Sequence, residues 1–261
     1  MLALAWLVFC MGQALADNLV ERGAYLTRAA GCMGCHTDRA GKGAPFAGGR
    51  ALKTPFGIFY SPNITAHKQT GIGAWSDGDF LAAVKQGIRP DGAHYFPVFP
   101  YTSYTLLRAE DVLAIKAYMF SLTPVARQNR AHDVGPPFSW RWSMGAWKQL
   151  YFDAGEFIAD DKQDAQWNRG AYLVNALAHC GECHTPRNAA GALDRTLWMA
   201  GTKDGPEGDA VPNITPAHNT GLGWPLDQLS FFLKTGTKPD WEKAEGLMAE
   251  AVQDGYKHLT D

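Results

Sequence analysis

The stretch Cys32-Met33-Gly34-Cys35-His36 recurs with the same spacing as Cys180-Gly181-Glu182-Cys183-His184. Each stretch follows the pentapeptide Arg-Gly-Ala-Tyr-Leu, at residues 22–26 and 169–173, and precedes Pro-Asn-Ile-Thr, at residues 62–65 and 212–215. Thr-Gly-x-Gly elements then follow at residues 70–73 and 220–223. The copies keep the same order about 150 residues apart. A period this long indicates two tandem domains rather than a solenoid.

Cys-x-x-Cys-His is the attachment pattern of a c-type haem. Its two thiols form thioethers with the porphyrin vinyl groups, and its histidine binds the iron from the proximal side. A Cys-x-x-Cys pair alone is also compatible with a disulfide or half a zinc site. The repeated histidine favours two covalently bound haem c groups. The predicted attachment residues are Cys32, Cys35, Cys180 and Cys183, and the predicted iron ligands are His36 and His184.

An electron-transfer haem often has a methionine as its second axial ligand. After His184 the chain offers Met199 and Met248, and Met248 lies beyond the turn at Pro239-Asp240. We predict that Met248 is the sixth ligand of the second iron, with a core role as the alternative.

The first iron lacks the corresponding methionine. Aligning Arg89-Pro90-Asp91 with Lys238-Pro239-Asp240 places Phe99 at the position of Met248. A phenyl ring cannot bind iron. The alternatives left open are His94, Met119, Met144 and an iron without a protein ligand on that side, and Met119 on its amphipathic segment suits a core role.

The chain divides into four predicted segments. Residues 1–16 are uncharged and apolar and end in Ala-Leu-Ala, which is typical of a secretory signal peptide. They fall short of the roughly 20 apolar residues that span a bilayer, although a short membrane anchor is the alternative. We expect a cytochrome c domain at residues 17–124 (the first repeat), an aromatic-rich interdomain segment at 125–165 (the linker) and a second such domain at 166–261 (the second repeat). A secreted chain is expected in the periplasm.

The predicted fold class is all-α, with two tandem cytochrome c-like domains whose long ordered loops surround haem. Helical spacing predicts helices at 18–30, 79–86, 109–122, 168–178 and 227–234. The stretches 37–74 and 185–223 show no strand alternation, and long loops of this kind need a partner such as haem to pack on. The aromatic linker is expected to pack across both repeats.

The second repeat ends where the counterpart of helix 109–122 would begin. In the first repeat, Gly23 is expected to allow close packing of Tyr118. The equivalent Gly170 is expected to have no partner helix. We therefore expect the second domain to lack its final helix and to be less stable than the first.

Charge is distributed unevenly along the chain. The net charge is −2, which gives no sign of nucleic-acid binding. The first repeat carries 11 basic and 8 acidic residues, the linker 5 and 6, and the second repeat 8 and 12. This asymmetry suggests that the second repeat docks a basic partner surface, beside Asp240, Glu242 and Glu245, and the first an acidic one. Surface solvation is the simpler explanation.

Both haem motifs, the Pro-Asn-Ile-Thr and Thr-Gly-x-Gly-x-Trp elements, and the segments at 89–97 and 110–118 resemble the cytochrome c subunits of membrane-bound bacterial dehydrogenases. The resemblance implies a dihaem cytochrome that carries electrons from a periplasmic dehydrogenase to quinone or an oxidase of the respiratory chain. It also implies peripheral membrane association through the partner. Many such subunits have three haem domains and a membrane anchor. In many the distal methionine stands where Phe99 lies here, and in some near Leu107.

Two other functions remain open at this stage. An open sixth position on the first haem would suit a peroxidase-like enzyme or a gas-binding protein. The chain shows no Arg-His pair at a spacing typical of peroxide cleavage. A thiosulfate-oxidising enzyme would need a further cysteine, but the fifth one, Cys10, falls in the predicted signal peptide.

Overall fold

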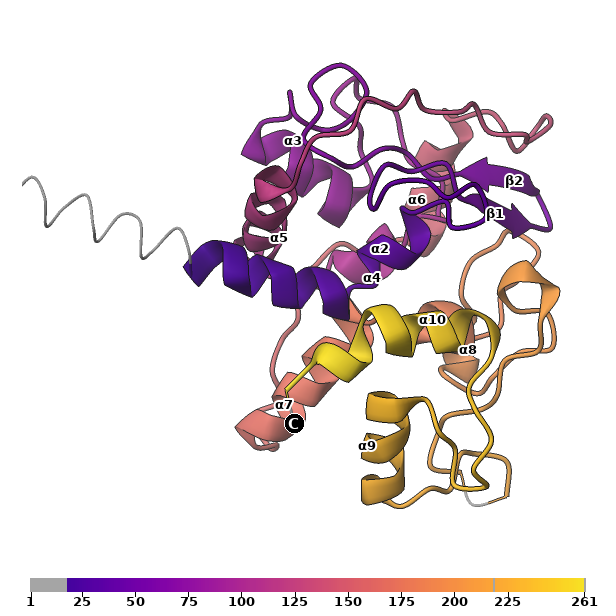
Figure 1. The fold of residues 1–261 in the computed structure, drawn as a ribbon. Helices are drawn as coiled ribbons and strands as arrows, with labels where there is room; N and C mark the ends of the chain where they lie inside the picture. The colour runs from indigo at the N-terminus through magenta and orange to yellow at the C-terminus, as the bar shows by residue number, and fades with distance from the viewer. Residues whose placement is uncertain (1–17, 218, 261) are drawn as a thin grey trace, which may run out of the picture.

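The computed structural model describes residues 18–217 and 219–260. The predicted signal peptide at 1–16, with Cys10, lies outside these residues. The described chain is mostly helical, with one two-stranded sheet (Figure 1). Within it, no helix combines the length and apolar character needed to cross a membrane.

The first repeat begins with a helix at residues 18–29. Further elements are α2 (Cys32–Cys35), β1 (Ala51–Thr54), β2 (Gly57–Tyr60), α3 (Asp77–Leu81), the π-helix η1 (Ala82–Gln86), α4 (Tyr101–Tyr104) and α5 (Ala109–Ser121). A reciprocal capping box between Ser76 and Asp79 starts α3, and Glu110 and Asp111 occupy the first turn of α5, where the helix dipole favours acids. The helices predicted at 18–30, 79–86 and 109–122 are therefore confirmed to within two residues.

Residues 51–60 form an antiparallel hairpin, so the prediction that the stretch 37–74 contains no strand was wrong there. Thr54 closes the turn, since its hydroxyl donates to the Gly57 carbonyl at 2.8 Å. Ile58 also exchanges two backbone hydrogen bonds of 2.8 Å with Asp133 of the linker. Burial does not alternate along β2, because the neighbouring residues Phe59 and Tyr60 are both buried, so the period-two pattern of a strand is missing from the sequence.

The linker contains α6 (Ser143–Tyr151). The second repeat contains α7 (Ala165–Tyr172), the π-helix η2 (Leu173–Leu177), α8 (Gly181–His184), the short 3₁₀ helices η3 (Arg195–Leu197) and η4 (Pro206–Gly208), α9 (Leu226–Thr235), α10 (Gly246–Asp254) and η5 (Tyr256–His258). The helix predicted at 168–178 starts three residues early, because Asp164 caps it by accepting from the Trp167 backbone at 2.7 Å. The helix predicted at 227–234 is confirmed, whereas α6 and α10 were not predicted.

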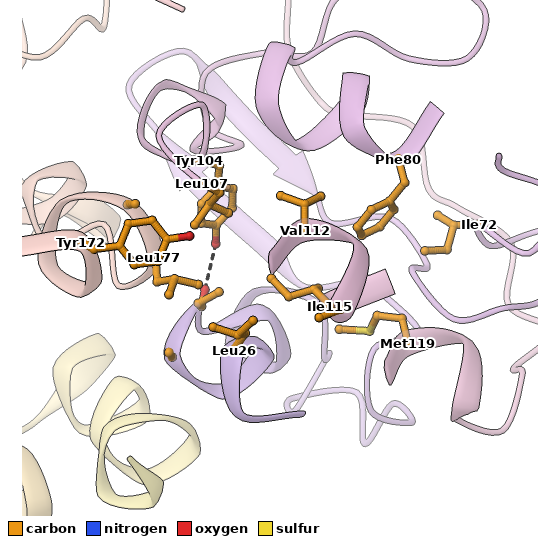
Figure 2. Close-up of a cluster of buried hydrophobic side chains, with 14 of the residues drawn as sticks. Leu26, Ile72, Phe80, Tyr104, Leu107, Val112, Ile115, Met119, Tyr172 and Leu177 are labelled. Carbon is orange, nitrogen blue, oxygen red and sulfur yellow. Dashed lines mark hydrogen bonds between the residues drawn. The ribbon is translucent and has the colours of Figure 1, made fainter. Parts of the chain in front are cut away.

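A buried core joins the two repeats. Figure 2 shows Leu26, Val112 and Met119 of the first repeat in the same cluster as Tyr172 and Leu177 of the second. The tyrosines of the two Arg-Gly-Ala-Tyr-Leu pentapeptides make reciprocal contacts across this junction. Tyr172 Oη accepts from the Arg108 backbone at 3.1 Å, and Tyr25 Oη lies 3.3 Å from Thr260 Oγ1. The repeats therefore pack as one unit.

Gly23 and Gly170 occupy equivalent positions with opposite surroundings. A Cβ at Gly23 would lie 1.9 Å from the Ala114 carbonyl oxygen and 2.9 Å from Tyr118 Cβ, which confirms the expected close approach. A Cβ at Gly170 would meet nothing within 4 Å. The lower stability expected for the second repeat stays a prediction.

The linker packs against both repeats, as predicted. Asn129 accepts from the Asn63 backbone at 2.7 Å in the first repeat, and Trp147 donates to the Ala190 carbonyl at 2.9 Å in the second. The ring of Phe157 packs against Tyr172, with centroids 5.5 Å apart. The linker therefore contributes to the junction rather than tethering the repeats loosely.

Candidate haem-binding sites

Each Cys-x-x-Cys-His motif forms one short helical turn. The first follows Gly31, which bends the chain at φ 64°, and forms α2. The second follows His179, at φ 41°, and forms α8. In a helical turn, residues three apart share a face, so each pair of cysteines can present both sulfurs to one ligand.

The four cysteines in the described chain are free thiols. The disulfide alternative is therefore wrong for this structure. Burial raises the pKa of Cys32 and Cys183 to about 12 and that of Cys180 to about 11. Among residues 18–217 and 219–260, no three His, Cys, Asp or Glu side chains gather as a metal-binding group.

The two motif histidines are held in the same way. His36 Nδ1 lies 2.8 Å from the Pro62 carbonyl oxygen, and His184 Nδ1 lies 2.8 Å from the Pro212 carbonyl oxygen. A carbonyl can only accept, so each Nδ1 carries the proton and each Nε2 keeps a free lone pair. Burial also lowers the pKa of both imidazoles, which keeps them neutral. A metal-binding histidine needs this tautomer and this kind of orienting hydrogen bond.

The Pro-Asn-Ile-Thr element explains how these carbonyls are aimed. In the first repeat, Asn63 Oδ1 accepts from the backbone and hydroxyl of Thr65 at 2.9 and 2.8 Å. In the second repeat, Asn213 makes the same two bonds with Thr215 at 2.8 and 2.7 Å. The asparagine turn fixes the preceding proline beside the histidine. The residues present therefore fit a haem with a proximal histidine in both repeats.

The turns that precede Phe99 and Met248 are hydrogen-bonded identically. Ile88 forms an isolated antiparallel β-bridge with His94 in the first repeat, and Thr237 forms the same kind of bridge with Lys243 in the second. In each repeat, the backbone N–H of the residue after this bridge donates to the carbonyl of the glycine that ends the preceding helix, at 2.8 Å in the first repeat and 2.7 Å in the second. Phe99 and Met248 each lie five residues beyond the bridge, so the structure supports their equivalence.

Met248 is partly buried on α10, near the start of that helix. Met199 lies instead in the loop after the second motif, where its backbone donates at 3.0 Å to Thr185, the residue after His184. In the first repeat Phe46 makes the matching bond to Thr37 at 3.2 Å. Met199 therefore corresponds to a core phenylalanine on the histidine side of the site.

The three candidate ligands of the first iron have other partners. His94 Nδ1 lies 3.1 Å from Lys148 Nζ, whose other hydrogen bonds go to two backbone carbonyls at 2.5 and 2.9 Å. A lysine ammonium donates, so His94 Nδ1 accepts and its Nε2 carries the proton, the reverse of His36. Met119 is 1% exposed in the core around α5. Met144 packs in a second cluster with Tyr101 and Trp147.

Contacts that the sequence analysis missed bring the two motifs together. The ring of Tyr104 packs edge-on against His179, with centroids 5.3 Å apart, and its hydroxyl donates to the Ala30 carbonyl at 2.8 Å. His179 directly precedes the second motif, and Ala30 lies two residues before the first. Tyr104 therefore bridges the two attachment turns.

Glu182, inside the second motif, adds a buried polar link. Its carboxylate accepts from Thr102 and Ser103 of α4 at 2.6 and 2.7 Å and pairs with Arg187 at 2.6 Å. Burial would raise the pKa of this carboxyl, but Arg187 and the hydroxyl donors lower it below the ordinary value. The only sequence signal was an acidic residue between the two cysteines of a motif.

Comparisons with known proteins agree with this geometry. A cytochrome c family profile matches residues 20–123. The diheme cytochrome c-type protein of Cereibacter sphaeroides is 40% identical over 237 residues, which cover 89% of this chain and 78% of the relative. The chain therefore belongs to the dihaem c-type cytochromes, which are electron-transfer proteins with two covalently bound haem c groups.

Two relatives that are longer than this chain are cytochrome subunits of dehydrogenases. The fructose dehydrogenase cytochrome subunit of Gluconobacter japonicus is 42% identical over 246 residues, and the gluconate 2-dehydrogenase cytochrome c subunit of Pantoea cypripedii is 39% identical over 255. These alignments cover 93% and 94% of this chain but 50% and 57% of the relatives. The chain thus spans about half of each of these relatives.

Proposed function

We propose that this chain accepts electrons from a membrane-associated dehydrogenase in the periplasm and passes them through two unlike haems to a quinone or an oxidase. The observation that carries the proposal is the matched pair of histidines. Each has its Nδ1 hydrogen bond directed to a proline carbonyl and its Nε2 left free. The relatives that serve gluconate and fructose dehydrogenases support the choice of partner class.

The chain's own residues would hold and orient the cofactors. Cys32 and Cys35 would attach one haem, and Cys180 and Cys183 the other, while His36 and His184 supply the proximal nitrogen. A bound haem supplies one-electron redox chemistry at its iron. The proline carbonyls restrain each imidazole, which would lower the reorganisation that accompanies each electron transfer.

The two sites would differ on the distal side. Met248 is proposed as the sixth ligand of the second iron, and Phe99 leaves the first iron without the equivalent methionine. The tautomer that Lys148 imposes on His94 supports an open position there, because Nε2 has no free lone pair. A methionine ligand raises the haem potential, so the second haem would be the better electron acceptor of the two.

Electron exchange within the chain is supported by the contact between the two motifs. Tyr104 and His179 pack between the attachment turns, where Tyr104 belongs to the buried core and His179 is partly buried. This contact would give electrons a path through packed groups from one haem to the other. A peroxidase-like or gas-binding role is less well supported, because the comparisons point to electron-transfer subunits.

The experiment begins with the purified full chain carrying both haems. It is mixed with gluconate or fructose dehydrogenase from which the native cytochrome subunit has been removed, and haem reduction is followed optically after substrate addition. Reduction of both haems in a time that depends on dehydrogenase concentration supports the proposal. Haem loss on denaturation, or no reduction by either dehydrogenase or by an alcohol dehydrogenase prepared likewise, would contradict it.

A further inference from the structure

Helix α10 lies between the two repeats. It contacts α9 of its own repeat on one side and α2, the first haem-attachment turn, on the other (Figure 1). The proposed ligand of the second iron, Met248, is therefore carried by a helix that rests on the first haem site. This arrangement raises the question of what holds α10 there.

The two faces of α10 differ in chemistry. At about 100° per residue, Val252 lies about 40° around the helix from Met248, whereas Glu250 and Asp254 lie about 200° and 240° away. Val252 is fully buried, and its side chain lies near Gly236, where a Cβ would be 3.6 Å away, in the second repeat. Met248 and Val252 thus share the face toward the second repeat, and the two acids occupy the opposite face.

Two arginines of the first repeat bind that acidic face. Arg50 donates to both carboxylate oxygens of Glu250, with Nη2 3.2 Å from Oε1, and lies 3.6 Å from Glu207. The same guanidinium donates to the Gly34 carbonyl at 2.7 Å, inside the first motif. Arg39, three residues past the first motif, pairs with Asp254. The side chain of Arg50 is 14% exposed, so its pairing is largely shielded from solvent.

Close packing at the end of α10 leaves little room for movement. A Cβ at Gly255 would lie 2.6 Å from the Arg28 carbonyl oxygen of the first repeat. The helix therefore contacts the first repeat through ion pairs along its length and through bare backbone at its end.

We propose that Arg50 and Arg39 are positioning residues for the second haem: they hold α10 against the first motif and so set the position of Met248 at the second iron. The inference rests on the proposed ligation by Met248. It makes the sixth ligand of one haem depend on residues that flank the other haem. Part of the charge difference between the repeats then forms ion pairs inside the molecule and is not available to a docking partner.

The test uses the full chain with both haems and the variants Arg50→Gln, Arg50→Lys and the charge swap Arg50→Glu with Glu250→Arg. The control is Arg89→Gln, which removes an ion pair with Asp91 inside the first repeat. The readouts are the charge-transfer band of methionine-ligated ferric haem, the two midpoint potentials and the number of carbon monoxide molecules bound per reduced chain.

We expect Arg50→Gln to weaken the methionine band, to lower one potential and to allow a second carbon monoxide to bind. Arg50→Lys and the charge swap should restore these signals in part, and Arg89→Gln should leave them unchanged. A merely structural role would lower thermal stability without moving the band. If Arg50→Gln does not fold, Glu250→Gln combined with Asp254→Asn tests the same contacts from α10.

Met248→Ala, measured in parallel, distinguishes a failure of the inference about Arg50 and Arg39 from a failure of the proposed ligation by Met248. If it abolishes the band while the Arg50 and Glu250/Asp254 variants keep both the band and the potential of the wild type, the inference is wrong and the proposed ligand stands. If Met248→Ala itself leaves the band and the potentials unchanged, the proposed function of Met248 fails, and the inference fails with it.

Discussion

The first and second repeats hold their proximal histidines identically but differ on the opposite side of the predicted haems. His36 and His184 each direct Nδ1 to a proline carbonyl at 2.8 Å, whereas the equivalent distal positions carry Phe99 and Met248. The two sites therefore share the geometry around the histidine and differ in the residue type at the opposite position, which is Phe in one and Met in the other. The comparison teaches that attachment and proximal ligation are built into the repeated elements, while the distal side is free to vary and set each haem's properties.

Removal of one attachment motif should have the largest effect. Replacing Cys32 and Cys35 by Ala should yield a chain that keeps one covalent haem, because Cys180 and Cys183 form an independent turn. Haem staining on a denaturing gel and the intact mass would show this result. The matched double variant of the second motif should give the same haem count. Loss of both haems from either variant would show that the sites do not load independently.

Replacement of Phe99 by Met should convert the first site into a copy of the second. We expect a higher potential for one haem, within the span of about 0.8 V that axial ligands cover, and a second methionine charge-transfer band. Phe96→Met is the matched control, because Phe96 is a buried ring of the same segment that packs on Phe59 and His132. The idea fails if both variants, or neither, produce the new band.

The unmodified protein should bind one carbon monoxide per reduced chain. On the proposed ligation, Phe99 would leave the first iron open, and Met248 would resist displacement at the second. An optical titration measures the stoichiometry, and Phe99→Met should abolish binding. Binding of no carbon monoxide by the unmodified protein would mean that a side chain such as His94, Met119 or Met144 occupies the first iron after all.

Much of this picture follows from local sequence. The haem motifs, the repeated Pro-Asn-Ile-Thr element and the first and last helices of the first repeat depend on residues close together in the chain, so spacing and capping reveal them. The hairpin at 51–60 gave no such signal, because burial does not alternate along β2. Glu182 and Arg50 act through residues about 80 and 200 positions away, and no local pattern reports such pairs.

The two equivalent glycines should respond oppositely to alanine. Gly23→Ala should destabilise the protein by about 1–3 kcal/mol, since its Cβ would overlap the Ala114 carbonyl. Gly170→Ala adds a Cβ in open space within α7 and should stabilise it by about 0.5–1 kcal/mol. Denaturant unfolding of both variants measures the difference. Equal effects of the same sign would contradict the unequal packing of the first helix in each repeat.

The smallest expected effect concerns docking. Asp240 and Glu242 are exposed near α10, as is Glu245 at its start, so reversing all three to Lys should slow reduction by a dehydrogenase with a basic docking surface. Rising salt should slow the unmodified protein as well, because the screening length falls to about 8 Å at physiological ionic strength. A rate that ignores salt and charge reversal would favour the exposed, stacked Trp140 and Trp142 of the linker as the docking surface.

The central claim is that the two irons are unlike because Met248 serves one of them alone. A spectroelectrochemical titration of the unmodified protein and of Met248→Ala tests it most directly. The account predicts two separated one-electron waves, of which the higher moves downward in the variant while the lower stays in place. A single wave for two equivalent haems, or two waves that Met248→Ala leaves unchanged, would contradict it.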